Sequence, residues 1–207
     1  MKKRTASRAK KTSFNKGQSR IKTILEAARD VFVDKGYNKL TMRKVALQAG
    51  ITVGNLNYYY QTKEALFHDM LDQVWESYQC EFDKVLETSS KTPEERLSSL
   101  IAYLIQDLNT PETTKFFPEL WALSNHDPYA QKMMEQIYSA ERQVIIDLIA
   151  EVKPELDENT KNELALYFSC TIEGMTMFVG SGKSHESSLK MMQQMACESF
   201  LNLLHTR

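Results

Sequence analysis

Helix-start signals recur along this chain so often that little room remains for any other secondary structure. A residue that can cap a helix precedes proline three times, at Thr92-Pro93, Thr110-Pro111 and Asp127-Pro128. Threonine and aspartate accept hydrogen bonds from the first free backbone N–H groups of a helix, and proline fits its first turn. Further caps stand at Thr62 and Asp157, and no segment alternates polar and apolar residues as a strand would. The chain is therefore predicted to be all-α.

These signals divide residues 64–207 into a body of six helices. The first is expected to run from Thr62 to about Thr88, and the second from Thr92 to about Leu108. The third begins after Thr110, and Pro118 is expected either to kink it or to restart it. The remaining three are expected over residues 129–151, 157–179 and 184–205.

The charge of the chain is divided sharply between its two parts. Residues 1–63 carry 15 Lys/Arg against three acids, a balance of +12, whereas residues 64–207 carry a balance of −13. The first 20 residues hold eight basic side chains and no acid, so residues 1–17 are predicted to form a disordered basic arm. A solubility tail is the alternative reading of this arm. The division itself indicates an N-terminal module that binds a polyanion.

Residues 18–63 show the pattern of three short helices. The first turns one apolar face inward and ends at Gly36, the second opens at Thr41 and ends at Gly50, and Thr52 caps a third over residues 53–59. Two short helices joined by a tight turn, with a helix beneath them and a basic flank, form a helix-turn-helix that reads DNA. We therefore predict a three-helix DNA-binding head.

Several residues of this head have the chemistry that DNA contact needs. The start of the second helix can present backbone N–H groups and long cations to phosphates, and the third helix carries short polar side chains suited to base edges. Leu56 is expected to be its buried anchor and Tyr60 to lie in the core. The predicted DNA contacts are Thr41, Arg43, Thr52, Val53, Gly54, Asn55, Asn57, Tyr58, Tyr59 and Lys63.

The run from Ile24 to Leu71 resembles the DNA-binding head of the TetR/AcrR family of bacterial repressors. The motifs that carry the resemblance are "AARDVFVDKGY", "TMRKVALQAGIT" and "GNLNYYYQTKEAL". The resemblance implies that most of the residues named above face DNA, although Asn57 stands where many members have tyrosine. It also implies a homodimer on a palindromic operator, with an effector domain behind the head.

Aromatic side chains in the body predict a ligand pocket. The segment "FFPELW" places three of them around Pro118, and others are expected on neighbouring helices. Ordinary core is the better interpretation for any single one of them. The predicted pocket residues are Tyr103, Phe117, Trp121, Tyr138, Met175 and Phe178, and the expected occupant is a small apolar or amphipathic molecule.

The last two helices carry apolar faces that could form a dimer seam, as they do in the family that the head resembles. An interior pair in a monomer is the alternative. The predicted interface residues are Tyr167, Phe168, Thr171, Gly174, Met192, Met195 and Phe200. Two-fold pairing would place two reading helices on one operator.

Other motifs of the sequence do not predict a catalytic or metal site. "GSGKS" at Gly180–Ser184 lacks the first glycine of a phosphate-binding loop and is expected to connect two helices. The four histidines have no ligand spacing, so no metal, cofactor or catalytic site is predicted. The N-terminus lacks the apolar core of a secretory signal and no long apolar run occurs, so a cytoplasmic protein without membrane contact is expected. The leading hypothesis is a dimeric, ligand-released transcriptional regulator, and the alternative is a DNA-anchored adaptor that binds a protein.

Overall fold

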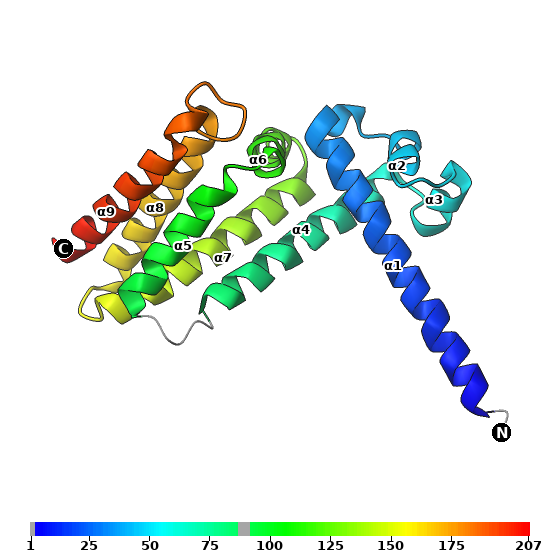
Figure 1. Ribbon diagram of the computed structural model, residues 1–207, viewed down its shortest axis with the longest axis horizontal. Helices are drawn as coiled ribbons and strands as arrows, with labels where there is room; N and C mark the ends of the chain where they lie inside the picture. Colours follow the sequence, from blue (N-terminus) through cyan, green and yellow to red (C-terminus); the bar gives the residue numbers. More distant parts are fainter. Residues whose placement is uncertain (1–2, 87–91) are drawn as a thin grey trace. The chain divides into compact units, whose positions relative to one another are not determined.

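The computed structural model describes residues 3–86 and 92–207, with side chains described for 17–84 and 92–207. Within these residues the chain forms nine α-helices and no strand, which confirms the all-α prediction (Figure 1). It divides into two compact units, Met1–Gln73 and Val74–Arg207. No helix in the described ranges is long and apolar enough to cross a membrane.

The first unit holds the three helices of the predicted head. Helix α1 spans Lys3–Lys35, α2 spans Met42–Gln48 and α3 spans Val53–Tyr59, with a short 3₁₀ turn at Tyr37–Lys39 between the first two. Gly36 has a φ of 72° and Gly50 a φ of 64°, the left-handed conformation that ends a helix most cheaply in glycine. The two glycine stops and the bounds of α3 are confirmed.

The structure carries α1 back to Lys3, where the sequence predicts a disordered arm over residues 1–17. The segment contains seven lysines and arginines, two alanines and no proline, and lysine, arginine and alanine favour helix once a helix is nucleated. Helix can also propagate outward from the packed residues that follow.

Helix α4, Lys63–Leu86, contributes residues to both units. The sequence places the domain boundary at residue 63, whereas the first unit extends to Gln73. The reason lies in the first turns of α4, where Leu66, Phe67 and Met70 are completely buried. The Phe67 ring lies 5.4 Å from the ring of Phe32 on α1, so this part of α4 belongs to the core of the head. The expected end of α4 near Thr88 lies outside the described residues.

The second unit contains the rest of α4 and the other five helices. These are α5 (Pro93–Asp107), α6 (Pro111–Ser124), α7 (Pro128–Val152), α8 (Glu158–Phe178) and α9 (Leu189–His205). Helix α5 packs against α7 and α9, and α7 in turn packs against α6 and α8, as Figure 1 shows. The sequence predicts a six-helix body, and the structure confirms it.

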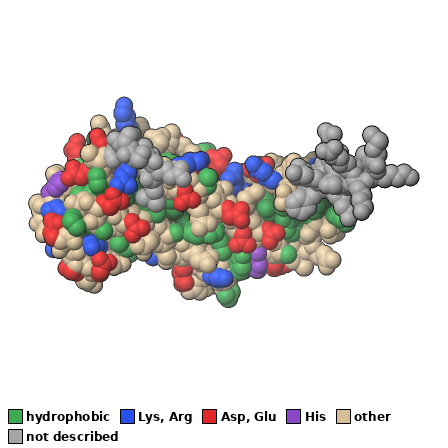
Figure 2. Space-filling view, turned by 90° about the horizontal axis from the view of Figure 1, so that it is seen from below, with side chains coloured by type: hydrophobic (Ala, Val, Ile, Leu, Met, Phe, Trp, Pro, Cys, Tyr) green, Lys and Arg blue, Asp and Glu red, His purple; other side chains and the backbone are tan. Residues whose placement is uncertain are grey.

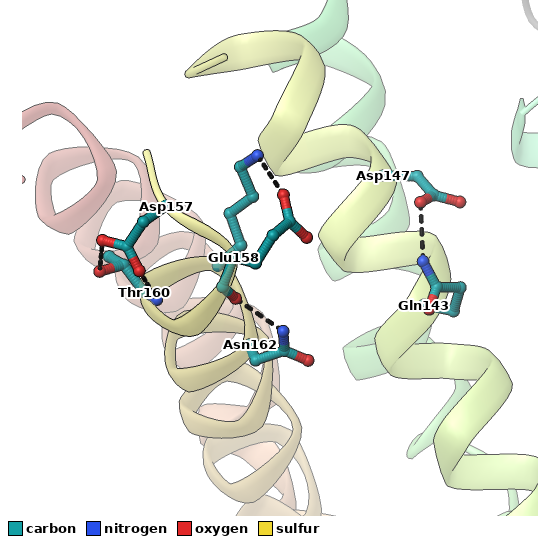
Figure 3. A network of polar contacts seen from close by, with 7 residues as sticks. Gln143, Asp147, Asp157, Glu158, Thr160 and Asn162 are labelled. Atoms are coloured by element: carbon teal, nitrogen blue, oxygen red, sulfur yellow. Dashed lines mark hydrogen bonds and ion pairs between the residues drawn. The ribbon is translucent and has the colours of Figure 1, made fainter. Parts of the chain in front are cut away.

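The caps that begin these helices are the ones that the sequence predicts. Thr92 and Glu95 form a complete capping box, and Asp127 accepts hydrogen bonds from two backbone N–H groups of α7. Asp157 accepts a hydrogen bond from the Thr160 N–H at 3.0 Å, as Figure 3 shows at the start of α8. Pro118 lies inside a continuous α6, and α9 begins a few residues later than expected because a 3₁₀ turn at Glu186–Ser188 precedes it.

Candidate functional site

Helix α3 turns almost its whole surface outward. Leu56 is its one buried side chain and is completely buried, so it fixes the helix to the rest of the head. The side chain of Thr52 caps the helix by accepting a hydrogen bond from the Asn55 N–H at 3.1 Å. Every other α3 residue through Tyr58 is exposed. A helix that needs only one anchor of its own leaves most of its side chains available for contact with another molecule.

The turn between α2 and α3 fixes the direction in which α3 leaves. The Ile51 N–H donates to the Ala46 carbonyl at 2.9 Å, and the Gly50 N–H donates to the Leu47 carbonyl at 3.2 Å. This pair of bonds around a left-handed glycine is the Schellman motif, which satisfies the last carbonyls of α2. The turn is therefore closed by hydrogen bonds within the backbone itself, and α2 and α3 form a defined helix-turn-helix.

The three consecutive tyrosines take different positions. Tyr60 is buried, as predicted, and its hydroxyl donates to Asp69 at 3.0 Å. Burial, with the Asp69 charge, raises the pKa of the Tyr60 hydroxyl. Tyr58 is 82% exposed, and the ring of Tyr59 meets it edge-on at 5.1 Å. Two of the three hydroxyls are thus left on the outer side of α3, where the sequence predicts phosphate contacts.

Lys63 begins α4 and bonds to the head rather than pointing freely into solvent. Its Nζ donates to the Tyr37 carbonyl oxygen at 2.9 Å and lies 3.6 Å from the centre of the Tyr37 ring. Burial lowers the pKa of this ammonium, and the Glu64 charge opposes that shift. The Lys63 side chain is therefore held against Tyr37. If Lys63 contacts DNA as predicted, its ammonium would have to bind a phosphate and Tyr37 at the same time.

Helix α2 adds an exposed surface that the sequence analysis covered only in part. Thr41 caps this helix by accepting from the Lys44 N–H at 3.4 Å, and Arg43 is exposed two residues before the buried Val45. Leu47 is 81% exposed and was not predicted to take part in any site. Its place outside the inward-facing positions of α2 is the signal that could have found it.

In the body, the structure brings together three of the six predicted pocket residues. The Trp121 Nε1–H donates to the Tyr138 hydroxyl at 2.8 Å, and the Phe117 and Tyr138 rings lie 6.1 Å apart. Tyr103 is partly buried, and burial, with Asp107 nearby, raises its pKa to about 12. Phe117, Trp121 and Tyr138 come from α6 and α7, and they form one aromatic cluster inside the body.

The other two pocket predictions have different outcomes. Met175 is buried within the main core of the body, whereas Phe178 is 64% exposed. Phe178 is the last residue of α8, and its side chain is largely in solvent. The structure therefore does not bring Phe178 into the aromatic cluster of α6 and α7.

The predicted dimer seam also divides into outer and inner residues. Phe168 and Phe200 are completely or almost completely buried, and their rings stack 4.1 Å apart between α8 and α9 of the same chain. Assigning these two to a surface interface is wrong, since they hold α8 and α9 together within one chain. Tyr167, Gly174 and Met195 are exposed, and Thr171 and Met192 are partly so.

Acidic side chains inside the body were missed by the sequence analysis. Glu141 on α7 is buried, and its Oε1 accepts from the Ser169 hydroxyl at 2.7 Å. Glu173 on α8 has a pKa raised to about 8, first by burial and then by the charge of Glu141. A signal was present in the sequence, because Glu141 interrupts the inward row of Ile137 and Ile145 at four-residue spacing.

Comparison with known proteins agrees with this geometry. Residues 24–70 match the family model described as bacterial regulatory proteins, tetR family. The chain is 24% identical over 144 residues to an HTH-type transcriptional regulator in the dhlA 5' region of Xanthobacter autotrophicus, covering 65% of this chain and 68% of that protein. It is 22% identical to the HTH-type transcriptional regulator BetI of Escherichia coli O157:H7, covering 82% of this chain and 87% of that one.

A solved structure has a similar fold along most of the chain. The crystal structure of a transcriptional regulator from Saccharomonospora viridis in complex with choline superposes with a TM-score of 0.75 at 22% identity. The superposition covers 88% of this chain and 95% of that one. The similarity therefore includes the helical body as well as the head.

The outward-facing α3, its closed turn and the all-α body define a DNA-binding protein of the helix-turn-helix class. Residues 24–70, which include this helix-turn-helix, are similar to the DNA-binding domain of bacterial regulatory proteins of the tetR family.

Proposed function

We propose that this chain is a TetR-family transcriptional regulator, a homodimeric repressor that binds a palindromic operator and leaves it when a small molecule occupies the body. The observation that carries the proposal is the exposure of α3. This helix buries only Leu56 against the rest of the head and exposes Val53, Asn55 and Asn57. Short polar and methyl-bearing side chains on an outward helix suit base edges in the major groove. Arg43 and the hydroxyls of Tyr58 and Tyr59 would then contact the phosphates.

An exposed apolar face on the last two long helices supports the dimer. Soluble monomers rarely leave large apolar side chains gathered on one surface. Six such side chains on α8 and α9 are exposed, at Leu166, Tyr167, Met177, Phe178, Met191 and Met195. Gly174 stands among the α8 residues with open space where a Cβ would be, so a second helix can approach closely there. A two-fold axis through this face would pair it with its own copy.

A small effector in the body is supported by the choline complex of the Saccharomonospora viridis regulator, which has the same fold. That similarity favours a ligand over the protein-binding adaptor considered as the alternative. Because α4 contributes residues to both units, a ligand-induced change in the body can reach the head through one continuous helix. The coupling needed is modest, typically about 1–3 kcal/mol.

Footprinting with two single variants tests the DNA assignment. Asn55→Ala should blur sequence preference, costing about 1–3 kcal/mol on the specific site while leaving non-specific binding almost unchanged. Lys63→Ala should weaken specific and non-specific DNA alike, with a salt slope lower by about one. A Lys63→Arg variant keeps the charge and serves as the control. Equal effects of Asn55→Ala and Lys63→Ala on every sequence would contradict the proposed division of roles.

Sedimentation tests the dimer separately. Phe178→Glu places a charge on the exposed face of α8 and should convert the dimer to a monomer at micromolar concentration. Leu47→Glu is the matched control, because Leu47 is also largely exposed but lies on α2 in the head. A wild-type chain that sediments as a monomer, or a Phe178→Glu variant that stays dimeric, would refute the proposed seam.

A further inference from the structure

Three carboxyl groups of the body lie within electrostatic range of one another, since Glu173 interacts with both Glu141 and Asp107. Asp107 ends α5 and accepts hydrogen bonds from the Thr113 hydroxyl at 2.7 Å and the Tyr78 hydroxyl at 3.1 Å. Burial raises the pKa of Glu141, and Glu173 is raised by its own burial and by the charges of Glu141 and Asp107. These carboxyls are close enough to repel one another when ionised.

No basic side chain neutralises this cluster. Among the described residues, none of the three carboxylates forms an ion pair with lysine or arginine within 4.0 Å, and Arg142 acts only at longer range on Glu141. On the face drawn in Figure 2, acidic and basic side chains are interspersed over the surface. Ionising these carboxyls in the interior is therefore costly, and a bound cation would offset that cost.

Aromatic rings surround the same carboxyls. Tyr138 interacts with the Glu173 carboxyl through its hydroxyl and accepts the Trp121 N–H at 2.8 Å. The Phe117 ring lies 6.1 Å from Tyr138 and 5.7 Å from Tyr78, whose hydroxyl donates to Asp107. Aromatic rings attract organic cations, tryptophan most strongly, and the attraction grows when water is excluded.

A buried hydroxyl in this region has no hydrogen-bond partner. Thr176 is completely buried and follows Glu173 by one turn of α8. Its Oγ1 makes no hydrogen bond of good geometry, although it lies near enough to lower the pKa of the Glu173 carboxyl. Buried hydroxyls are nearly always paired in folded proteins, so this one, beside the Glu173 carboxyl, can also pair with a polar group of a ligand.

We propose that the body binds a small organic cation, with Glu173 and Glu141 supplying the opposing charge and Trp121 and Tyr138 the aromatic surface. The inference rests on the proposed function, since it names the chemical class of the effector, and it replaces the apolar or amphipathic molecule expected from the sequence. An alkylated ammonium fits better than a metal ion. Within the described residues no three His, Cys, Asp or Glu side chains converge as metal ligands.

Calorimetry on the full-length protein tests the charge of the ligand directly. The probes are choline and tetramethylammonium, and the control is 3,3-dimethylbutan-1-ol, which replaces the choline nitrogen with carbon. Both cations should bind at millimolar concentration or below, and the uncharged alcohol at least about tenfold more weakly. Binding of the alcohol as tightly as choline, or no heat from either cation in this range, would overturn the proposal.

Two Glu→Gln substitutions on α8, one at Glu173 and one at Glu163, test where the cation binds. Glu173→Gln should weaken both cations by about tenfold or more, whereas Glu163→Gln on the exposed side of α8 should leave them unchanged. Trp121→Leu keeps an apolar side chain and should weaken the cations without changing the alcohol. Unchanged cation affinity in Glu173→Gln would refute the site.

The pH dependence gives a readout that a purely structural carboxyl would not give. Glu173, whose pKa is about 8, must lose its proton to the buffer when the cation binds, with Tyr138 and Glu141 on α7 and Asp107 on α5 facing it. Affinity should therefore rise by up to roughly tenfold per pH unit below 8 and level off above it, and Glu173→Gln should remove this slope. Operator binding without ligand separates the two proposals: intact DNA binding with no cation effect overturns this inference alone, and absent DNA binding overturns the proposed function.

Discussion

Helix α3 carries its candidate functional residues on its exposed face, whereas helix α8 carries its candidate ligand-binding residue, Glu173, toward the interior of the body. Helix α3 buries Leu56 alone, so the residues that predict DNA contact are those left over on its outside. Helix α8 buries Phe168 and Met175, exposes Tyr167 and Phe178, and holds Glu173 among the aromatic rings of the body. The head therefore presents its chemistry on a surface, whereas the body holds its chemistry within the packing of several helices.

The anchoring of α3 provides the largest expected effect. Leu56→Ala removes the only buried side chain of that helix and should destabilise the head by about 2–5 kcal/mol, because a cavity remains where the side chain packed. Urea denaturation followed by circular dichroism measures the loss, and operator binding should disappear with it.

Leu47→Ala on the neighbouring helix α2 is the control for this experiment. Leu47 is 81% exposed, so its truncation should change stability by no more than about 0.5 kcal/mol. A similar loss of stability in both variants would mean that α3 is not held by Leu56, and the contrast between the two helices would fail.

The buried carboxyl of Glu173 should make the stability of the body depend on pH. The pKa of Glu173 rises from an ordinary 4.5 to about 8, so its favourable protonated form is fully present at low pH and is lost as pH rises through 8. The free energy of unfolding of the body should accordingly fall as pH rises from 4.5 to about 8, by on the order of 3 kcal/mol once solvent screening is allowed for. Glu173→Gln should flatten the decline, measured by thermal unfolding from pH 5 to pH 9. A wild-type profile that rises with pH would contradict it.

Local chemistry explains why so much of the fold could be predicted. The caps at Thr52, Thr92 and Asp157 act within three residues of the chain, so each helix start is encoded next to itself. The same holds for Gly50, whose left-handed conformation both ends α2 and directs α3. The candidate DNA-contact residues follow from these local signals, since only Leu56 faces inward on α3.

The interior of the body could not be predicted in the same way. Helix α8 is apolar on more than one side, so periodicity cannot decide whether Phe168 or Phe178 turns toward the other helices. That choice depends on packing among α5, α7 and α9, which lie far apart in the sequence. Glu141 is different, because its place in the apolar row of Ile137 and Ile145 is visible in the sequence.

The cap of α3 should have an intermediate effect. Thr52→Ala removes the side-chain acceptor for the Asn55 N–H and should cost about 1 kcal/mol of head stability. Thr52→Ser keeps the acceptor and should recover most of that loss, as hydrogen exchange at the Asn55 amide can measure. If both variants exchange like the wild type, α3 depends on Leu56 alone and the cap contributes nothing.

The smallest effect on stability is expected for a carboxylate on the surface of the protein. Glu26 forms an ion pair with Lys22 at 3.9 Å on the exposed side of α1, and both side chains are at least half exposed. Glu26→Gln makes the same chemical change as Glu173→Gln, yet water already screens the charge that it removes. The free energy of unfolding should therefore change by less than about 0.5 kcal/mol, and less still in high salt. Urea denaturation at two ionic strengths measures it, and a shift as large as that of Glu173→Gln would show that carboxylate burial is not what distinguishes the body from the head.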